Sequence, residues 1–344
     1  GMGVLVFVLA VSPMANGDSG DALHLLRAES PGVNVGKLVP RMRRSTTILY
    51  LIYIGLTVLM FVLLIFDMPF FDALTTAFAT AGTGGFSIRN AGMSVYSPYS
   101  QTVITVFMIL FSINFTLYYL LLIGKFRQAL RSEEMWVFLG ILAAVSLAVA
   151  VNILPLFSGF GEAFRHAIFT AASVMSTSGF AISDFNLWPW LSKTLLVVLM
   201  FVGACAGSTG GGIKTSTLFV LIQGIKASAT GKSEKGFRYS VPREAFRKAA
   251  VITLIGLGIV VTGTYIMTVM EPGLELKDIL FEVISAFGTV GLSTGITSGL
   301  GIGSKILSII IMYIGRLGPL TIVSLWYFTP GERTSFPDGN IVVG

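Results

Sequence analysis

Three short segments carry residue types suited to coordinating a dehydrated cation. Each has threonine first, glycine third and a large apolar residue fourth, and the copies are Thr83-Gly84-Gly85-Phe86, Thr177-Ser178-Gly179-Phe180 and Thr289-Val290-Gly291-Leu292. An ion filter needs backbone carbonyls aimed at a pore axis. The unusual backbone that delivers them favours glycine, and a threonine hydroxyl adds a further oxygen. The first three residues of each copy are therefore the predicted ion-binding residues.

The composition places these segments in a membrane protein. Hydrophobic residues make up 54% of the chain and charged residues 12%, whereas about a quarter of the residues of soluble domains are charged. The positive charges lie in short loops between apolar runs, which is the pattern of membrane topology, so no nucleic-acid partner is predicted. The single cysteine, Cys205, excludes a disulfide within the chain.

Long apolar runs alternate with shorter ones. A hydrocarbon core about 30 Å thick needs about 20 helical residues per crossing. Six runs are predicted to cross, at 46–66, 99–123, 134–155, 190–225, 246–270 and 303–328. Three shorter segments end at the tetrapeptides and are predicted to be re-entrant pore helices, at 70–82, 161–175 and 276–287. The predicted fold is an all-α membrane protein built from tandem units of outer helix, pore helix, filter and inner helix.

The distribution of Lys and Arg predicts the orientation. Sixteen of them lie in one set of loops and five in the alternate set, and the richer set is expected in the cytoplasm. The filters then lie near the outer face, and the C-terminus of a multi-pass protein of the cytoplasmic membrane lies inside. The predicted divisions are an inner-helix remnant and linker at 1–45, followed by pore units at 46–132, 133–243 and 244–344.

The run at 190–225 is too long for one crossing, and its middle is rich in glycine. Glycine and hydroxyl residues there predict a helix break, because glycine costs about 1 kcal/mol per helical position. We interpret the break as a gate loop below the filter; the alternative is close helix packing through small residues. The predicted gate residues of this loop are Gly207, Ser208, Thr209, Gly210, Gly211, Gly212 and Lys214.

Arg316 is a charge inside the last apolar run. A charge at the bilayer centre costs at least about 2.5 kcal/mol and usually faces water or a partner. Arg316 is predicted to act at the gate, either by holding the permeating ion back or by anchoring the glycine loop through its carbonyls. The structural alternative is that it satisfies carbonyls freed by Pro319. Asn114, in the second long run, is expected to make an interhelical hydrogen bond. No enzymatic constellation and no resident cofactor are predicted.

Together these residues resemble the Trk/Ktr/HKT superfamily of potassium transporters, most closely its TrkH-like pore subunits. Besides the three filters, the resemblance is carried by Gly-Thr-Val-Gly-Leu-Ser-Thr-Gly at 288–295, Ala-Gly-Ser-Thr-Gly-Gly-Gly-Ile-Lys at 206–214 and Ile-Gly-Arg-Leu-Gly-Pro at 314–319. It implies a pseudo-fourfold pore for K⁺ or Na⁺, a homodimer, and control by a separate cytoplasmic nucleotide-binding ring. The ring is expected to dock on the basic face that includes 228–248.

The chain departs from this pattern by having three filters instead of four. Its first residues look like the inner helix of a unit whose earlier part is missing, so a truncated chain is expected. All three filters keep glycine at the third position, and we therefore predict K⁺ permeation with modest preference over Na⁺. The alternative class is a secondary transporter, coupled to Na⁺ or H⁺, with a broken-helix binding site.

Overall fold

The computed structural model describes residues 42–230 and 243–318. These residues form helices and connecting segments, and the one β-type pairing among them is an isolated bridge between Val202 and Ile213. The α-helices are α3 (Met42–Leu64), α4 (Phe70–Ala81), α5 (Pro98–Ser112), α6 (Phe115–Leu122), α7 (Phe126–Ala129), α8 (Glu133–Ile153), α9 (Phe160–Met175), α10 (Trp190–Phe201), α11 (Thr215–Thr230), α12 (Arg243–Met270), α13 (Leu276–Gly288) and α14 (Ile302–Leu317). Four short 3₁₀ turns lie at Gly92–Val95, Leu154–Leu156, Phe185–Leu187 and Thr297–Gly299.

Three of the described helices are long and apolar enough to cross a membrane. Their candidate spans are Thr47–Leu64, Glu133–Leu156 and Glu244–Met270, and the bent pair α5 and α6 makes a fourth if it is counted as one span. Many large hydrophobic side chains on these helices point outward, including Leu59 and Leu254. Outward apolar side chains suit a lipid environment.

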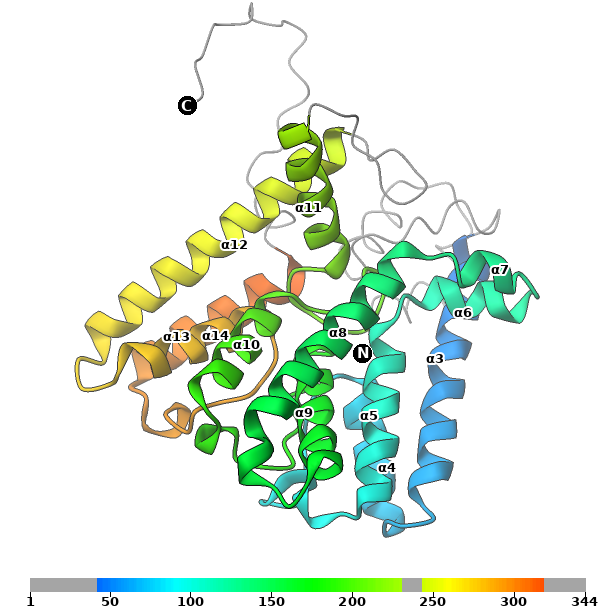
Figure 1. Ribbon diagram of the computed structural model, residues 1–344, viewed down its shortest axis with the longest axis horizontal. Helices are drawn as coiled ribbons and strands as arrows, with labels where there is room; N and C mark the ends of the chain where they lie inside the picture. The colour runs from blue at the N-terminus through cyan, green and yellow to red at the C-terminus, as the bar shows by residue number, and fades with distance from the viewer. Residues whose placement is uncertain (1–41, 231–242, 319–344) are drawn as a thin grey trace, which may run out of the picture.

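One packing arrangement occurs three times. Each pore helix packs against the long helix before it and the helix after it, so that α4 lies with α3 and α5, α9 with α8 and α10, and α13 with α12 and α14. Neighbouring units also meet in a repeated way, because α5 packs against α9 and α10 packs against α13. Figure 1 shows the three groups in chain order, from blue and cyan through green to yellow and orange. The expected repeat of outer helix, pore helix and inner helix is present.

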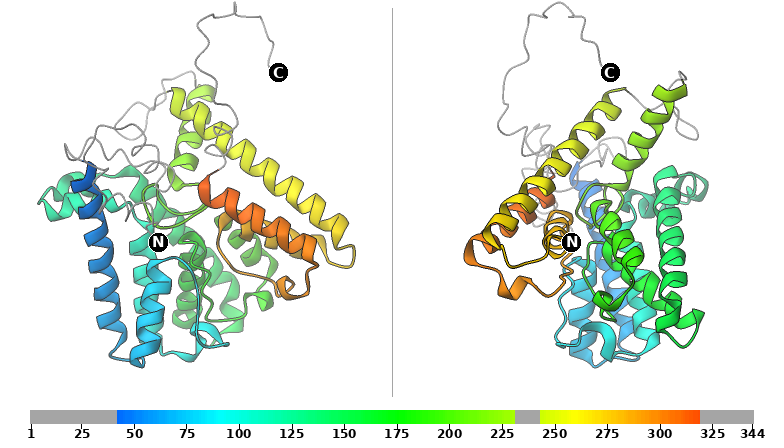
Figure 2. Two further views of the ribbon diagram at one scale, coloured as in Figure 1. Left: turned by 180° about the vertical axis from the view of Figure 1, so that it is seen from behind. Right: turned by 60° about the vertical axis from the view of Figure 1, so that its left-hand side comes forward.

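The three pore helices agree with the sequence prediction within two residues at each end. The predicted break in the fourth apolar run is also present. Helix α10 ends at Phe201, helix α11 begins at Thr215, and the residues between them form an extended loop. Figure 2 shows this loop passing between the helical groups. We call residues 203–214 the gate loop.

The run predicted to cross at 99–123 is broken into two helices, which pass the length and hydropathy test for a span only when taken together. Helices α5 and α6 bend by 91° at Ile113 and Asn114. The Asn114 side chain accepts a hydrogen bond from the Thr116 backbone N–H at 2.9 Å and so caps its own helix. The expected interhelical bond of Asn114 was therefore wrong. The sequence hides the break because no glycine or proline lies in that run.

Candidate ion pathway

The first residue of each filter has the same unusual backbone. Thr83, Thr177 and Thr289 have φ values of 50°, 56° and 54°, and they are the non-glycine residues with positive φ in the described ranges. A β-branched residue seldom adopts this left-handed conformation. The glycines two residues later also have positive φ, at 65°, 76° and 90°. Strain at matching positions of three segments indicates one shared local structure.

The end of each pore helix fixes that structure. The backbone N–H of the second filter residue donates to a carbonyl five residues back, from Gly84 to Ala79 at 2.8 Å and from Ser178 to Ser173 at 2.9 Å. In the third filter the same bond joins Val290 to Ser285 at 3.0 Å. The N–H groups thus point back into the helix end. Within the described part of the chain, no protein donor bonds to a carbonyl oxygen of the nine filter residues.

The filters touch one another through their glycines. A Cβ atom added at Gly85 would lie 1.8 Å from the Ser178 carbonyl oxygen, and one added at Gly179 would lie 2.3 Å from that of Val290. Each glycine therefore packs against the middle carbonyl of the next filter. A Cβ at Gly291 would meet no described atom within 4 Å. The two contacts run in the same direction, from the first filter to the second and from the second to the third.

Serine hydroxyls hold the outer ends of two filters. Ser173 donates to the Phe180 carbonyl and Ser285 donates to the Leu292 carbonyl, each at 2.7 Å. Phe180 and Leu292 are buried. In the first filter the position that corresponds to these two serines is Ala79, which has no hydroxyl. The residue that corresponds to Phe180 and Leu292 is Phe86, and it is 80% exposed. The three filters are thus alike at their threonines and unlike at their outer ends.

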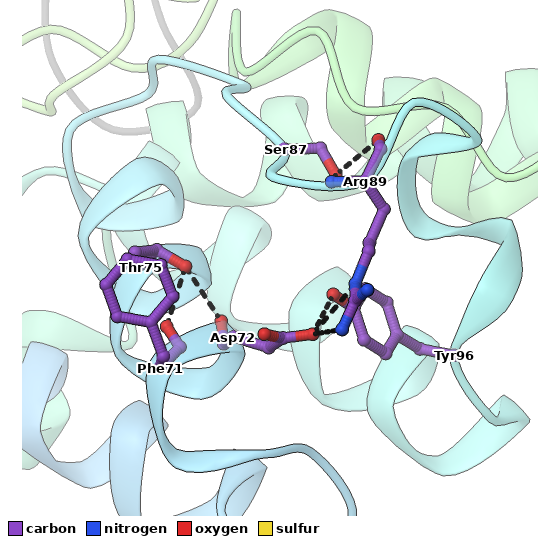
Figure 3. Close-up of polar contacts among 6 residues, drawn as sticks. All are labelled: Phe71, Asp72, Thr75, Ser87, Arg89 and Tyr96. Atoms are coloured by element: carbon purple, nitrogen blue, oxygen red, sulfur yellow. Dashed lines mark hydrogen bonds and ion pairs between the residues drawn. The ribbon is translucent and has the colours of Figure 1, made fainter.

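The first pore unit has an ionic contact behind its filter (Figure 3). Asp72, in the first turn of α4, is buried, and its carboxylate accepts from the Arg89 side chain at 3.1 and 3.2 Å. The Tyr96 hydroxyl donates to the same oxygen at 2.9 Å. Arg89 lies in the segment that follows the filter, so this contact ties that segment to the start of the pore helix. At the corresponding position of the second unit, the His166 ring packs 4.5 Å from that of Phe157.

The third pore unit uses a different acidic residue, which the sequence analysis missed. Glu282 is buried in α13, and its carboxylate accepts hydrogen bonds from the Ser293 and Thr297 hydroxyls. Ser293 lies two residues after Gly291. This carboxylate therefore fixes the chain that leaves the third filter. An acidic residue inside an apolar pore helix was the available signal.

The gate loop lies against all three filter threonines. The Thr83 hydroxyl lies 3.3 Å from the Thr209 carbonyl oxygen and 2.7 Å from that of Gly82, and its proton is shared between them. The Thr177 hydroxyl accepts from the Gly211 N–H at 2.8 Å. A Cβ at Gly211 would be 1.9 Å from Thr289 Oγ1, so only glycine allows this approach. The loop therefore contacts the first residue of every filter, and its role as a gate stays a prediction.

The loop is also bonded to the break between α5 and α6. The Thr209 N–H and hydroxyl both donate to the Phe111 carbonyl, at 3.2 and 3.1 Å. The Cys205 N–H donates to the Ser112 carbonyl, and the Phe115 N–H donates to that of Gly207, each at 3.1 Å. Backbone groups exposed by two helix breaks thus satisfy one another, which avoids several kcal/mol per unpaired group in a membrane.

Two cationic side chains bind carbonyls of the loop. Arg316, near the end of α14, donates through Nη1 to the Thr209 carbonyl at 3.4 Å, and Lys214 donates to that of Gly210. The Thr209 carbonyl therefore accepts from both Arg316 and the filter residue Thr83. Close packing of α14 beneath the third filter requires glycine, since a Cβ at Gly315 would lie 1.9 Å from the Phe287 carbonyl. Pro319 is outside the described residues.

Three short helices, three matching tetrapeptides and a loop bonded across them define a helical membrane-protein fold built from a repeated unit. A family model described as "Cation transport protein" (TrkH) matches residues 1–144 and 136–330. The chain belongs to the TrkH family.

Similar proteins come from several bacteria. The Trk system potassium uptake protein TrkH of Salmonella typhimurium is 33% identical over 231 residues, which cover 65% of this chain and 47% of that protein. The Ktr system potassium uptake protein B of Bacillus subtilis is 38% identical over 169 residues, or 49% of this chain and 38% of that protein. The Trk system potassium uptake protein TrkH of Halomonas elongata is 29% identical over 352 residues, which cover 96% of this chain and 70% of that protein.

The fold matches a solved structure. The crystal structure of the potassium transporter TrkH from Vibrio parahaemolyticus superimposes with a TM-score of 0.79 at 24% identity, covering 96% of this chain and 69% of that one. This likeness shows the fold. The chain spans about half the length of the Salmonella relative that it matches.

Proposed function

We propose that the chain is part of a potassium uptake protein in the cell membrane, and that K⁺ crosses it through the three filters. The observation that carries the proposal is the pair of contacts between successive filters, in which Gly85 lies against Ser178 and Gly179 lies against Val290. Nine carbonyls without a described protein donor are available to replace the water around an ion. The names of the Salmonella and Bacillus relatives support K⁺ as the substrate.

The pore units proposed for the chain are 46–132, 133–243 and 244–344. The repeated packing of α4, α9 and α13 supports this division. A pseudo-fourfold pore needs a fourth unit, and the segment 1–45 is proposed to belong to it. Residues 1–41 lie outside the described residues.

The gate loop is proposed to close the ion path beneath the filters. Its bonds to Thr83 and Thr177 place backbone at the inner end of the filters, where a permeating ion must pass. Arg316 is proposed to act as the anchor of this closed loop, since its guanidinium bonds the Thr209 carbonyl. Movement of the loop on the μs–ms timescale would open the path.

A homodimer controlled by a cytoplasmic nucleotide-binding ring completes the proposal. An uncontrolled K⁺ pore would dissipate the membrane potential, and the loop offers a part that a partner can move. The proposed docking surface includes 228–248, with Lys232, Lys235 and Arg238. Residues 231–242 of this surface are outside the part of the chain that the structure describes. The C-terminus is proposed to lie in the cytoplasm, and lipid to surround the outer helices.

The proposal is tested by ion flux. The protein containing this chain is expressed in cells that lack their own K⁺ uptake systems, and it is also reconstituted into liposomes. Growth at low K⁺ and uptake of ⁸⁶Rb⁺ are expected, with K⁺ preferred to Na⁺. An absence of Rb⁺ uptake by well-folded protein, or Na⁺ permeation equal to that of K⁺, would contradict the proposal.

A further inference from the structure

One carboxylate is bonded to the start of the gate loop. Glu134 lies in the first turn of α8, and its Oε1 accepts a hydrogen bond from the Ala206 N–H at 2.6 Å. Ala206 directly precedes residues 207–212, of which four are glycine. The carboxylate also interacts with Ser216, in the first turn of α11 beyond the loop. A single side chain from a neighbouring helix therefore holds the loop at the residue before its glycines.

In the described part of the chain, Glu134 is one of three charged side chains that contact the gate loop, and the other two are Lys214 and Arg316. The carboxylate interacts electrostatically with Lys214, which in turn lies near Arg316. Both of these cations bond carbonyls of the loop. The loop thus lies between an acid that accepts from its Ala206 N–H and two cationic side chains that donate to its C=O groups. Removing one partner from such a buried polar set leaves the others unsatisfied, so the loop is favoured in this position.

A cavity brings Glu134 within reach of the end of the molecule that we predict to be cytoplasmic. It has a volume of about 650 Å³. Its lining residues are Leu120, Arg127, Gln128, Arg131, Ser132, Glu133 and Glu134. Glu133 faces the same cavity, but its Oε1 atom is buried without a hydrogen-bond partner among the described residues. Glu133 is therefore a matched control, with the same type of side chain in the same helix turn and no hydrogen bond to the loop among the described residues.

We propose that Glu134 is a latch, a positioning residue that bonds the gate loop at Ala206 and keeps the loop closed beneath the filters. This inference rests on the proposed role of the loop as a gate. Loss of the carboxylate frees the Ala206 N–H, and the glycines that follow have no side chains to hold the loop in place. The permeation path itself is unchanged, since Glu134 makes no hydrogen bond to a filter residue in the described part of the chain.

Cys205 provides a direct test of the latch. It is the single cysteine of these 344 residues, it is 1% exposed, and it adjoins Ala206. The full protein in membranes is treated with a maleimide from the cytoplasmic side, and modification of the Cys205 peptide is followed by mass spectrometry. Labelling in Glu134→Ala is expected to be at least about tenfold faster, the ratio that follows from losing one hydrogen bond to a charged group. Glu134→Gln keeps an acceptor for Ala206 and should give a smaller increase.

The Glu133 variant is the control for this experiment, and two results would overturn the latch. Glu133→Gln should label at the wild-type rate. Equal Cys205 labelling in wild type and Glu134→Ala would overturn the latch, and so would an equal increase in Glu133→Gln. If Glu134→Ala is poorly retained in the membrane, Glu134→Gln decides by the same criterion. The proposed transport is judged separately, because wild-type protein without Rb⁺ flux would contradict it whatever the labelling rates.

Discussion

The Thr177 hydroxyl accepts a hydrogen bond from the Gly211 backbone N–H at 2.8 Å, so a filter residue and the gate loop are bonded directly. The same threonine has a φ of 56° and begins the second filter. Movement of the loop would therefore change the surroundings of this threonine. In the proposed function, this bond links gating to ion coordination, between residues that are 34 positions apart in the sequence.

Replacing Thr177 with valine tests this link. Valine keeps the branched shape and removes the acceptor, and a net hydrogen bond contributes about 1 kcal/mol, or roughly a fivefold change in an equilibrium. We expect basal Rb⁺ flux in liposomes to rise by about that factor. Thr177→Ser retains the hydroxyl and should stay within about twofold of wild type. Equal flux in the two variants would contradict a role for the bond.

Substitution at Gly85 tests the packing of the filters. A Cβ there would lie 1.8 Å from the Ser178 carbonyl oxygen, and the φ of 65° adds strain. Gly85→Ala is therefore expected to abolish growth at low K⁺ or to lower the K⁺/Na⁺ permeability ratio severely. Gly55→Ala is the control, because a Cβ in that helix would meet no described atom within 4 Å. Normal selectivity in folded Gly85→Ala would refute the contact between filters.

Arg316 tests the anchoring of the loop. Its guanidinium bonds the Thr209 carbonyl, which also accepts from Thr83. Arg316→Ala should increase basal flux and weaken its dependence on the cytoplasmic partner, with an unchanged K⁺/Na⁺ ratio. Arg316→Lys retains a donor on a shorter reach and should lie between alanine and wild type. Unchanged flux in Arg316→Ala would leave this residue with a packing role alone.

Glu271 gives a pH-dependent prediction on the outer face. Its carboxylate accepts from the Gly301 N–H at 2.7 Å and the Ser304 hydroxyl at 2.8 Å, and these bonds lower the pKa of Glu271. A carboxyl with a lowered folded pKa adds stability above its unfolded pKa, and this stability is lost as the pH falls through the folded pKa. Glu271→Gln should therefore lower the thermal midpoint at pH 7 and have a smaller effect below about pH 4. An equal effect at both pH values would contradict the prediction.

The repeated parts of the fold could be predicted because their signals are local. The lengths of the apolar runs predicted the pore helices. The positions of the glycines predicted the filter segments and the break between α10 and α11. The bend at Asn114 could not be predicted, since the carbonyls freed there are satisfied by Cys205 and Thr209, about 90 residues away. Glu134 was missed for the same reason, because the Ala206 N–H that it binds lies 72 residues away. Glu282 could have been found, since it is an acidic residue inside an apolar pore helix and its partners Ser293 and Thr297 lie in the segment that follows.

Joint coordination of K⁺ by the three filters is tested most directly by anomalous diffraction. Crystals of the full protein are grown with Tl⁺ in place of K⁺. We expect Tl⁺ peaks on one axis, among the carbonyls of Thr83, Thr177 and Thr289 and the carbonyls of the filter residues that follow each of them. Displacement of these peaks by excess K⁺, but not by excess Na⁺, should accompany them. A filter region without Tl⁺ density in crystals that show Tl⁺ elsewhere would contradict the claim.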